Sequence, residues 1–307
     1  MTTALITHPA CYRHEMGEFH PECPSRVGAI SDALIEAGLY DLLVQHRAPC
    51  ATRAQLERVH DADYINFIEK HAPKEGYWHL DNETVMNPFT LEAARRAAGA
   101  VTKGVDLVMS GAVENAFCNV RPPGHHAERA EGMGFCFFNN IAVGAAHALL
   151  QKGIRKVLIL DFDLHHGNGT EDIFQDNQEV VICSSFQYPN YPDEKYAKDS
   201  SHIVNVTLQA GEGSVEFRDR IAEHWFPAIN AEKPDFFLVS AGFDGHGDDP
   251  LSELNLTVDD FYWLTQQLME LAEKHASGRI VSSLEGGYDL SALGRSAAAH
   301  IRALMSL

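Results

Sequence analysis

VLILDFDLHHGNG, residues 157–169, is the stretch that decides the fold. Four aliphatic residues run directly into two aspartates and two histidines, so an apolar strand ends in groups that are costly to bury unpaired. Because side chains alternate between the faces of a strand, Asp161, Asp163 and His165 point the same way while the chain stays extended. Neighbouring carboxylates repel each other unless a cation or a protonated histidine lies between them, and a metal ion is the simplest solution.

Similar apolar runs alternate with helical patterns along the whole chain. Strands are expected at Ala4–Thr7, Ala116–Val120, Val157–Asp163, Val180–Ser184, Ile203–Leu208, Phe236–Ala241 and Ile280–Leu284. Helices are expected at Pro24–Leu43, Thr90–Ser110, Asn139–Lys152, Ser214–Asn230, Thr257–His275 and Leu290–Met305. Most of the strand candidates are apolar on both faces, which is typical of parallel strands covered by helices on each side. The alternation predicts a single α/β domain over residues 1–307 with right-handed crossovers.

Composition excludes several classes of protein. The chain has 307 residues, 45% of them hydrophobic, and contains no apolar run that approaches the roughly 20 residues of a membrane span. Its start lacks the basic and then apolar pattern of a secretory signal, and its six cysteines form no CxxC pair, so a cytoplasmic location is expected. The formal net charge of −19 disfavours nucleic-acid binding, although it would attract cationic ligands.

Polar segments follow four of the predicted strands. They read RPPGHHAE (121–128), DFDLHHGNG (161–169), GFDGHGDDPL (242–251) and EGGYDL (285–290). A solvated turn explains one such segment, but not four that together carry paired histidines, an Asp-x-Asp-x-His pattern and a tyrosine. Because ligands bind beyond the carboxyl ends of the strands in open parallel sheets, these segments predict one active site at that edge.

The residue types in these segments indicate a metal site. Asp163 and His165 are the candidate local ligands, and Asp244, after another strand, is the natural third. Such a set could hold zinc, iron(II), cobalt(II) or manganese(II), and three protein ligands leave a coordination position open for catalysis. The alternative is a salt-bridged polar cluster that holds no metal.

The remaining groups fit metal-assisted hydrolysis of a carbonyl substrate. His125 and His126 follow the rigid RPPG turn and can both reach one cavity, where a histidine suits the role of general base. Asp161, one step deeper than the candidate ligands, could orient such a histidine. Tyr288 could donate a hydrogen bond to a substrate oxygen, or it could simply pack at a loop.

These motifs, together with GFCFFNN (134–140) and HPECPSR (20–26), resemble the zinc-dependent histone deacetylase family and its bacterial amidohydrolase relatives. The resemblance runs in order over most of the chain, and RPPGHHAE and Asn168 are closer to the class II branch than to class I. It implies the α/β arginase–deacetylase fold, with a mostly parallel central sheet of about eight strands and helices on both faces. It also implies one catalytic zinc ion held by Asp163, His165 and Asp244.

The resemblance assigns roles to the other residues. His126 would be the general base and acid, His125 with Asp161 the electrostatic histidine, and Tyr288 the group that polarises the acyl carbonyl. Asn168 stands where class I members have an aspartate bound to the second histidine, so it would support a His126 cation less strongly. The implied substrate tunnel comprises Gly134, Phe135, Tyr191, Leu251 and Gly287. A structural potassium ion is implied at Asp161, Asp163, His165 and Ser184.

Departures from the family pattern bear on the substrate. Gly167 and Gly242 replace the carboxylates that two-manganese arginase-like relatives need, which favours one catalytic metal. The glycine-rich loop of the family is replaced by YPDEKYAKDSSH (191–202). Phe186 occupies a position where the family often has histidine, and Asp248 occupies one where it usually has glycine. Leu251 stands where polyamine-selective relatives can carry an acid.

We therefore expect an acyl-lysine peptide or protein as substrate, with an acetylpolyamine or another small acylated amine as the alternative. A catalytically silent protein that only binds acyl-lysine is a third reading, which the complete set of chemical groups disfavours. Inhibition by hydroxamates is expected, no nucleic-acid or membrane partner is expected, and the oligomeric state, a homo-oligomer included, stays open.

Overall fold

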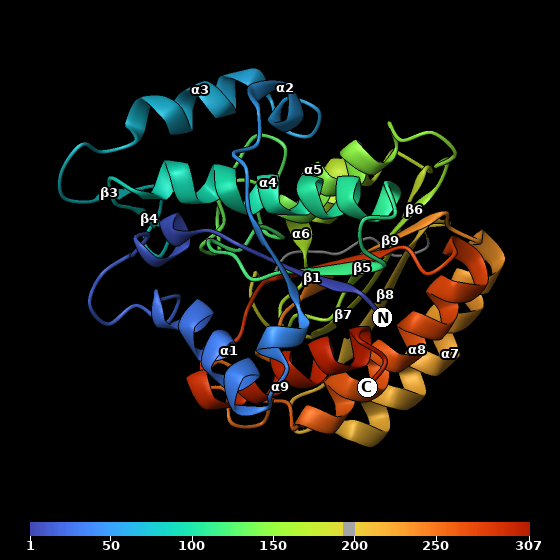
Figure 1. Cartoon of the computed structure of the whole chain (residues 1–307). Coiled ribbons are helices and arrows are strands. Elements are labelled where there is room, and N and C mark those ends of the chain that lie inside the picture. The colour runs from blue at the N-terminus through green and yellow to red at the C-terminus, as the bar shows by residue number, and fades with distance from the viewer. Residues whose placement is uncertain (193–199) are drawn as a thin grey trace.

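A central parallel sheet organises the molecule in the computed structural model, which describes residues 1–192 and 200–307 (Figure 1). Its eight strands lie in the order β2-β1-β5-β10-β9-β6-β7-β8, and each neighbouring pair is parallel. They are β1 (Thr3–Thr7), β2 (Val44–Arg47), β5 (Asn115–Cys118), β6 (Val157–Asp161), β7 (Val180–Gln187), β8 (Ile203–Leu208), β9 (Phe236–Ala241) and β10 (Ile280–Leu284). A separate antiparallel pair consists of β3 (Trp78–His79) and β4 (Val85–Met86).

Helices cover both faces of the sheet, as the doubly apolar strands predict. One face carries α2 (Arg53–Leu56), α3 (Ala62–His71), α4 (Thr90–Met109) and α5 (Asn140–Ala148), and the other carries α1 (Ser25–Glu36), α7 (Ser214–Glu232), α8 (Val258–Ala276) and α9 (Leu290–Leu304). The short α6 (Asn168–Phe174) follows β6. Alternate residues of one strand enter opposite cores: Val157 and Ile159 pack with α4 and α5, whereas Leu158 and Leu160 pack with α7 and α8. The predicted α/β class is therefore confirmed.

Several predicted boundaries were wrong, each for a local reason. The first helix ends at Glu36 rather than Leu43, because Gly38 adopts a left-handed φ of 68° that a continuing helix does not allow. The edge strand β2 was missed, since its side chains are mostly exposed and show no apolar run. The helices α2, α3 and α6 were also missed.

The predicted strand at Val157–Asp163 is two residues too long, since β6 ends at Asp161. Its three polar side chains are therefore not aligned by strand alternation alone. Asp161 Oδ1 accepts the N–H of Asp163 at 3.1 Å, and Asp163 Oδ1 accepts the N–H of His165 at 2.9 Å. Each aspartate side chain thus accepts the N–H of the residue two positions later and stabilises a turn there, as short polar side chains do in Asx turns.

The strand order brings the four polar segments together. The strands β5, β10, β9 and β6 are consecutive in the sheet, and each is followed by one of the segments. Parallel strands end at the same edge, so the segments meet there. No helix in the described part of the chain is long and apolar enough to cross a membrane.

Candidate active site

Asp163, His165 and Asp244 form the centre of the site at this edge. His165 Nδ1 lies 3.1 Å from Asp163 Oδ1 and 3.1 Å from Asp244 Oδ2, and all three residues are buried. The main chain fixes both carboxylates, because Asp163 Oδ2 accepts the Gly286 N–H at 2.8 Å and Asp244 Oδ1 accepts the Leu164 N–H at 2.9 Å. The three expected ligands are therefore held together, with one potential ligand atom of each within 4.8 Å of the others.

The donor geometry fits a small divalent metal ion. Ligand atoms about 2.0–2.1 Å from a tetrahedral zinc ion lie roughly 3.3 Å apart, close to the 3.1 Å that separates His165 Nδ1 from each of the two carboxylates. The electrostatics agree: burial and the charge of Asp163 raise the pKa of Asp244 to about 7. Burial opposes a proton on His165, but hydrogen bonds to Asp163 and Asp244 prevail and raise its pKa to about 10. The two carboxylates thus favour a positive charge in the space between them.

Two glycines leave no room for a second set of carboxylates. A Cβ atom at Gly167 would overlap Asp161 Oδ2, and one at Gly242 would overlap Asp163 Oδ2. In the described ranges, Asp163, His165 and Asp244 are also the one group of acidic, histidine or cysteine side chains that converges closely enough for a metal. These findings fit the expectation of a single catalytic ion.

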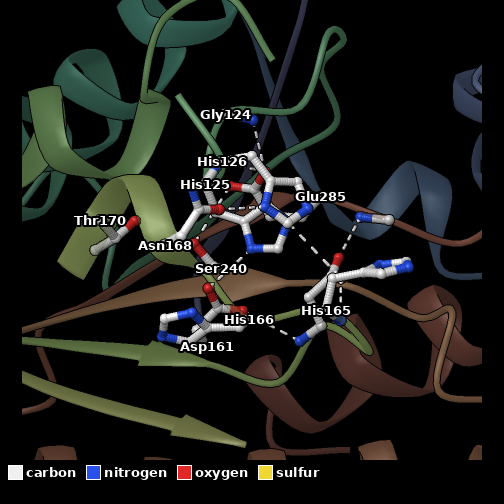
Figure 2. Close-up of polar contacts among 12 residues, drawn as sticks. Gly124, His125, His126, Asp161, His165, His166, Asn168, Thr170, Ser240 and Glu285 are labelled. Atoms are coloured by element: carbon white, nitrogen blue, oxygen red, sulfur yellow. Dashed lines mark hydrogen bonds and ion pairs between the residues drawn. The ribbon is translucent and has the colours of Figure 1, made fainter. Parts of the chain in front are cut away.

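The histidine pair lies beside the candidate ligands, and Figure 2 shows the two rings next to each other. Their centroids are 4.0 Å apart. His125 Nδ1 lies 3.0 Å from Asp161 Oδ2, and its Nε2 lies 3.7 Å from Asp163 Oδ1. His126 Nδ1 lies 2.7 Å from Asn168 Oδ1, an amide oxygen that can only accept, so His126 donates from Nδ1 and leaves Nε2 free of a proton when neutral.

The environments of the two histidines differ sharply. Burial disfavours charge on His125, but the adjacent carboxylates of Asp163 and Asp161 prevail and raise its pKa well above the usual value. For His126, burial and the neighbouring His125 hold the pKa well below it. One histidine is thus favoured as a cation and the other as a neutral base, the divergence typical of acid–base sites.

Tyr288 completes this group. Its ring is edge-on to Phe135, with centroids 5.9 Å apart, and burial raises the pKa of its hydroxyl well above 10, so the group stays a hydrogen-bond donor. Asp249 accepts the Tyr288 N–H at 2.6 Å, and Arg26 Nε donates to the Gly287 carbonyl at 2.7 Å. The loop that carries the tyrosine is therefore fixed on both sides.

A cavity of about 390 Å³, which we call the site cavity, opens onto these groups. It is lined by His20, Pro21, Asn82, Glu83, His126, Gly134, Phe135, His165, Asn190, Tyr191, Leu251 and Tyr288. A larger, more open groove of about 730 Å³ between α1, α8 and α9 contains none of the candidate ligands or active-site histidines. The site cavity is therefore the place where a substrate can reach the candidate chemistry.

Four of the five expected tunnel residues line the site cavity. Gly134 has φ 54°, and a Cβ there would lie 2.5 Å from His126 Cδ2, so glycine keeps the ring of His126 accessible. The Tyr191 ring stands edge-on to His126, with centroids 5.1 Å apart. The fifth, Gly287, lies outside the lining. The loop that departs from the family pattern is described at Tyr191, Pro192 and residues 200–202, and its part 193–199 lies outside the described residues.

The second histidine of the pattern, His166, lies apart from the candidate ligands. Its Nε2 is 3.0 Å from Glu171 Oε2 in α6, and its ring is 4.6 Å from that of Phe186. His166 is thus in contact with α6 and is not one of the three candidate ligands. Phe186, at a position where the family often has histidine, packs its apolar ring against His166.

The expected potassium residues lie together beneath the site. Asp161 pairs with Ser184 in the register of β6 and β7. Ser184 is buried, and its hydroxyl has no hydrogen-bond partner within residues 1–192 and 200–307. A buried hydroxyl oxygen without a partner is a suitable ligand for a hard cation.

Sequence reasoning missed several residues that shape the site. Asp249 and Glu285 stand inside segments that the sequence singled out, yet neither received a role. Arg26 stands in HPECPSR, and its contact with Gly287 joins positions 261 apart in the chain, which no local pattern reveals. Asn82 and Glu83 reach the cavity through the β3–β4 turn, and that pair of strands was not predicted.

Comparisons with known proteins agree with this geometry. The family model for the histone deacetylase domain matches residues 20–304. The chain is 38% identical to an uncharacterised protein of Synechocystis sp., over 98% of this chain and 99% of that one. It is 35% identical to a probable deacetylase of Archaeoglobus fulgidus, over 94% and 82% of the two chains. A polyamine deacetylase of Mus musculus, HDAC10, is 34% identical over 99% of this chain and 48% of its own length.

The fold has a close counterpart among solved structures. The crystal structure of the HDA15 HD domain superposes with a TM-score of 0.93 at 33% identity, over 99% of this chain and 90% of that one. The agreement covers the parallel sheet of eight strands and its helices on both faces, as the resemblance in the sequence implies.

Proposed function

The chain belongs to the histone deacetylase family, whose members hydrolyse amides, and from this premise we propose that it removes the acyl group from N-acyl-lysine side chains of peptides or proteins. The observation that carries the proposal is the site cavity. Its aromatic residues Phe135 and Tyr191 adjoin His126, His165 and Tyr288, so an acylated side chain that enters would meet these groups.

The candidate ligands Asp163, His165 and Asp244 would hold one zinc ion. When bound, such an ion polarises a carbonyl group and lowers the pKa of water to about 7. The donor set of two carboxylates and one imidazole, its close separations and its buried negative charge support this assignment.

The chain's own groups divide the acid–base work. His126 Nε2, neutral and facing the site cavity, would take the proton from the attacking water and later deliver it to the departing amine. His125, favoured as a cation by Asp163 and Asp161, would stabilise negative charge that develops nearby. The Tyr288 hydroxyl would donate a hydrogen bond to the acyl oxygen, where charge accumulates in the transition state.

The test is turnover of an acetyl-lysine peptide by protein whose metal content has been measured. We expect acetate release that requires the metal and that a hydroxamate inhibits. Absence of turnover with zinc, iron and cobalt in turn would refute the proposal. Tight peptide binding without turnover would instead favour a protein that only reads acyl-lysine.

A small acylated polyamine is the second candidate substrate. Glu83, a carboxylate-bearing residue, lines the site cavity together with Leu251, and the net charge of −19 favours cationic ligands. We nevertheless rank it second, because Leu251 offers no charge to a distal ammonium group. The ratio of kcat/KM for an acetyl-lysine peptide and for N-acetylputrescine separates the two, and a higher value for the polyamine would reverse the order.

We further propose a structural potassium ion bound by the backbone oxygens of Asp161 and His165 and by side-chain oxygens of Asp163 and Ser184. The unpartnered hydroxyl of Ser184 supports it. Potassium chloride should raise the thermal midpoint more than the same concentration of sodium chloride does. In Ser184→Ala this difference should shrink, and equal midpoints in the two salts for the unmodified protein would exclude the ion.

A further inference from the structure

Glu285 is a buried acid at the centre of the site that the proposed chemistry does not use. It follows β10 directly and is 0% exposed. Its Oε2 accepts the N–H of Gly124 at 2.6 Å and the N–H of His125 at 3.1 Å. Its Oε1 accepts the hydroxyl of Ser240 at 3.2 Å. Figure 2 shows this carboxylate beside the histidine pair.

The position is costly for an acid. Burial raises the pKa of Glu285 to about 7, and no lysine or arginine within residues 1–192 and 200–307 forms an ion pair with its side chain. Burial of a carboxyl group is costly, and here the positive charge favoured on His125 and three hydrogen bonds offset part of that cost. Two of its three hydrogen bonds go to the turn at Gly124 and His125, so Glu285 supports that turn.

That turn carries the histidine pair. On one side it is pressed against the start of α5, where Asn140 Nδ2 donates to the Pro122 carbonyl at 3.0 Å and a Cβ at Gly124 would overlap the Asn140 backbone nitrogen. The other supports of the turn are the two bonds to Glu285, the Thr170 N–H, which donates to the His125 carbonyl at 3.1 Å, and the side-chain contacts of the two histidines with Asp161 and Asn168. Loss of the carboxylate would leave two buried N–H groups unpaired and loosen the turn, although its other contacts would remain.

The same stretch of chain holds two other parts of the site. The next residue, Gly286, donates its N–H to Asp163 Oδ2 at 2.8 Å, and Tyr288 follows two residues later. Glu285 therefore ties the loop with the histidines to the loop with the tyrosine, with a metal-ligand candidate between them. Their separation along the sequence is large, since His125 and Glu285 lie 160 positions apart.

We propose that Glu285 is a positioning residue: by accepting the N–H groups of Gly124 and His125, it fixes the His125–His126 pair relative to the candidate metal ligands and Tyr288. The inference rests on the proposed hydrolase function and adds to it a residue that touches neither substrate nor metal. Displacement of catalytic groups by about 1 Å can cost 10²-fold in rate, so such a residue controls kcat.

Substitutions at this position separate hydrogen bonding from charge. In Glu285→Gln the amide oxygen can still accept both N–H groups, and the amide nitrogen can donate to Ser240. Glu285→Leu removes every acceptor at similar volume. Ser283→Ala is the matched control, because Ser283 pairs with Ser240 in the register of β10 and β9, is equally buried, and makes no hydrogen bond through its hydroxyl to any described residue.

We expect Glu285→Leu to lower kcat by about 10- to 100-fold, with KM and zinc content within about twofold of the unmodified enzyme. Glu285→Gln should recover kcat to within about threefold, and Ser283→Ala should leave it unchanged. A Glu285→Leu enzyme with the kcat of the unmodified protein, or a glutamine variant as impaired as the leucine variant, would overturn the inference. A fall in kcat that merely follows a loss of folded protein or of zinc would also overturn it.

A second readout does not depend on turnover. Long-range ¹H–¹⁵N spectra of the imidazole rings report the tautomer and surroundings of each histidine, and the His126 signals can be assigned with a His126→Ala variant. In Glu285→Leu the signals of both rings should shift or broaden, whereas in Glu285→Gln they should coincide with those of the unmodified protein. Unchanged rings in the leucine variant would refute the positioning role, even if the protein proved to have no deacylase activity.

Discussion

At the scale of single residues, the site separates groups of the same type by their surroundings. His125 and His126 are adjacent in sequence, yet the first contacts two carboxylates and the second an amide and the site cavity. The residues alone predicted that both would reach one cavity, whereas of the two only His126 is in the lining of the site cavity. The resemblance implied, through Asn168, that His126 is the less readily protonated of the two. The structure adds the cause, which is contact with residues 36 to 42 positions away. Tyr288, for which packing and catalysis remained open in the sequence, lines the cavity.

Tyr288→Phe is the sharpest test at this scale. The substitution keeps the ring against Phe135 and removes only the hydroxyl. Loss of one donor to a developing oxyanion typically costs about 10²- to 10³-fold in kcat, so we expect a loss of that size with unchanged zinc content. Steady-state kinetics with an acetyl-lysine peptide give the answer, and an unchanged kcat would remove Tyr288 from the mechanism.

At the scale of elements, strand ends are better defined by the sequence than the turns that follow them. The consecutive strands β5, β10, β9 and β6 were all predicted, because buried parallel strands are uniformly apolar. For the turns, only the composition could be predicted. The structure shows that Asp161 and Asp163 each accept the N–H of the residue two positions later. The strands β2, β3 and β4 left no comparable pattern, because β3 and β4 have two residues each and β2 is mostly exposed.

The turn after β10 gives a prediction at this scale. A Cβ at Gly286 would overlap Asp244 Oδ2 and lie 2.6 Å from Asp163 Oδ2, between the two candidate metal-binding carboxylates. Gly286→Ala should therefore weaken zinc binding at least about tenfold, since mispositioned ligands lose affinity on that scale. Competition against a zinc chelator measures this, with Gly28→Ala in α1 as control, because there the nearest atom is Tyr12 Cε1 at 3.9 Å. Equal affinities for the two variants would show that the turn adapts.

At the scale of the whole molecule, two separate cores lie on the two faces of one sheet. A buried histidine packs against an aromatic ring of each core, His60 against Phe138 and His300 against Phe117, and hydrogen bonding keeps both neutral. His60 Nε2 accepts the Asn139 N–H at 2.9 Å while its Nδ1 donates to the Glu128 carbonyl at 2.9 Å. Thr265 donates its hydroxyl to the Phe261 carbonyl, so His300 Nδ1 must donate to it, and His300 Nε2 accepts from Ser282. Neither ring can gain a proton without losing an accepted hydrogen bond.

These two histidines predict how acid destabilises the fold. Burial lowers the pKa of His60 to about 4 and that of His300 to about 3, against about 6.5 for the unfolded chain. Their folded pKa values are depressed, so their contribution to stability is complete above about pH 6.5 and is lost as the pH falls towards 4. Each should add a slope of about 1.4 kcal/mol per pH unit to the free energy of unfolding in that window.

The prediction can be tested by urea unfolding of the unmodified protein and of His300→Gln between pH 6.5 and 4.5. The variant is expected to be less stable at pH 7, but its stability should fall less steeply with acid, by about 1.4 kcal/mol per pH unit. Because both proteins share the same metal site, metal release in acid cancels in the difference between them. The exposed His224→Gln serves as control and should keep the slope of the unmodified protein. Parallel curves for all three proteins would mean that His300 takes up no additional proton on unfolding, and the acid sensitivity would then have to come from elsewhere in the two cores.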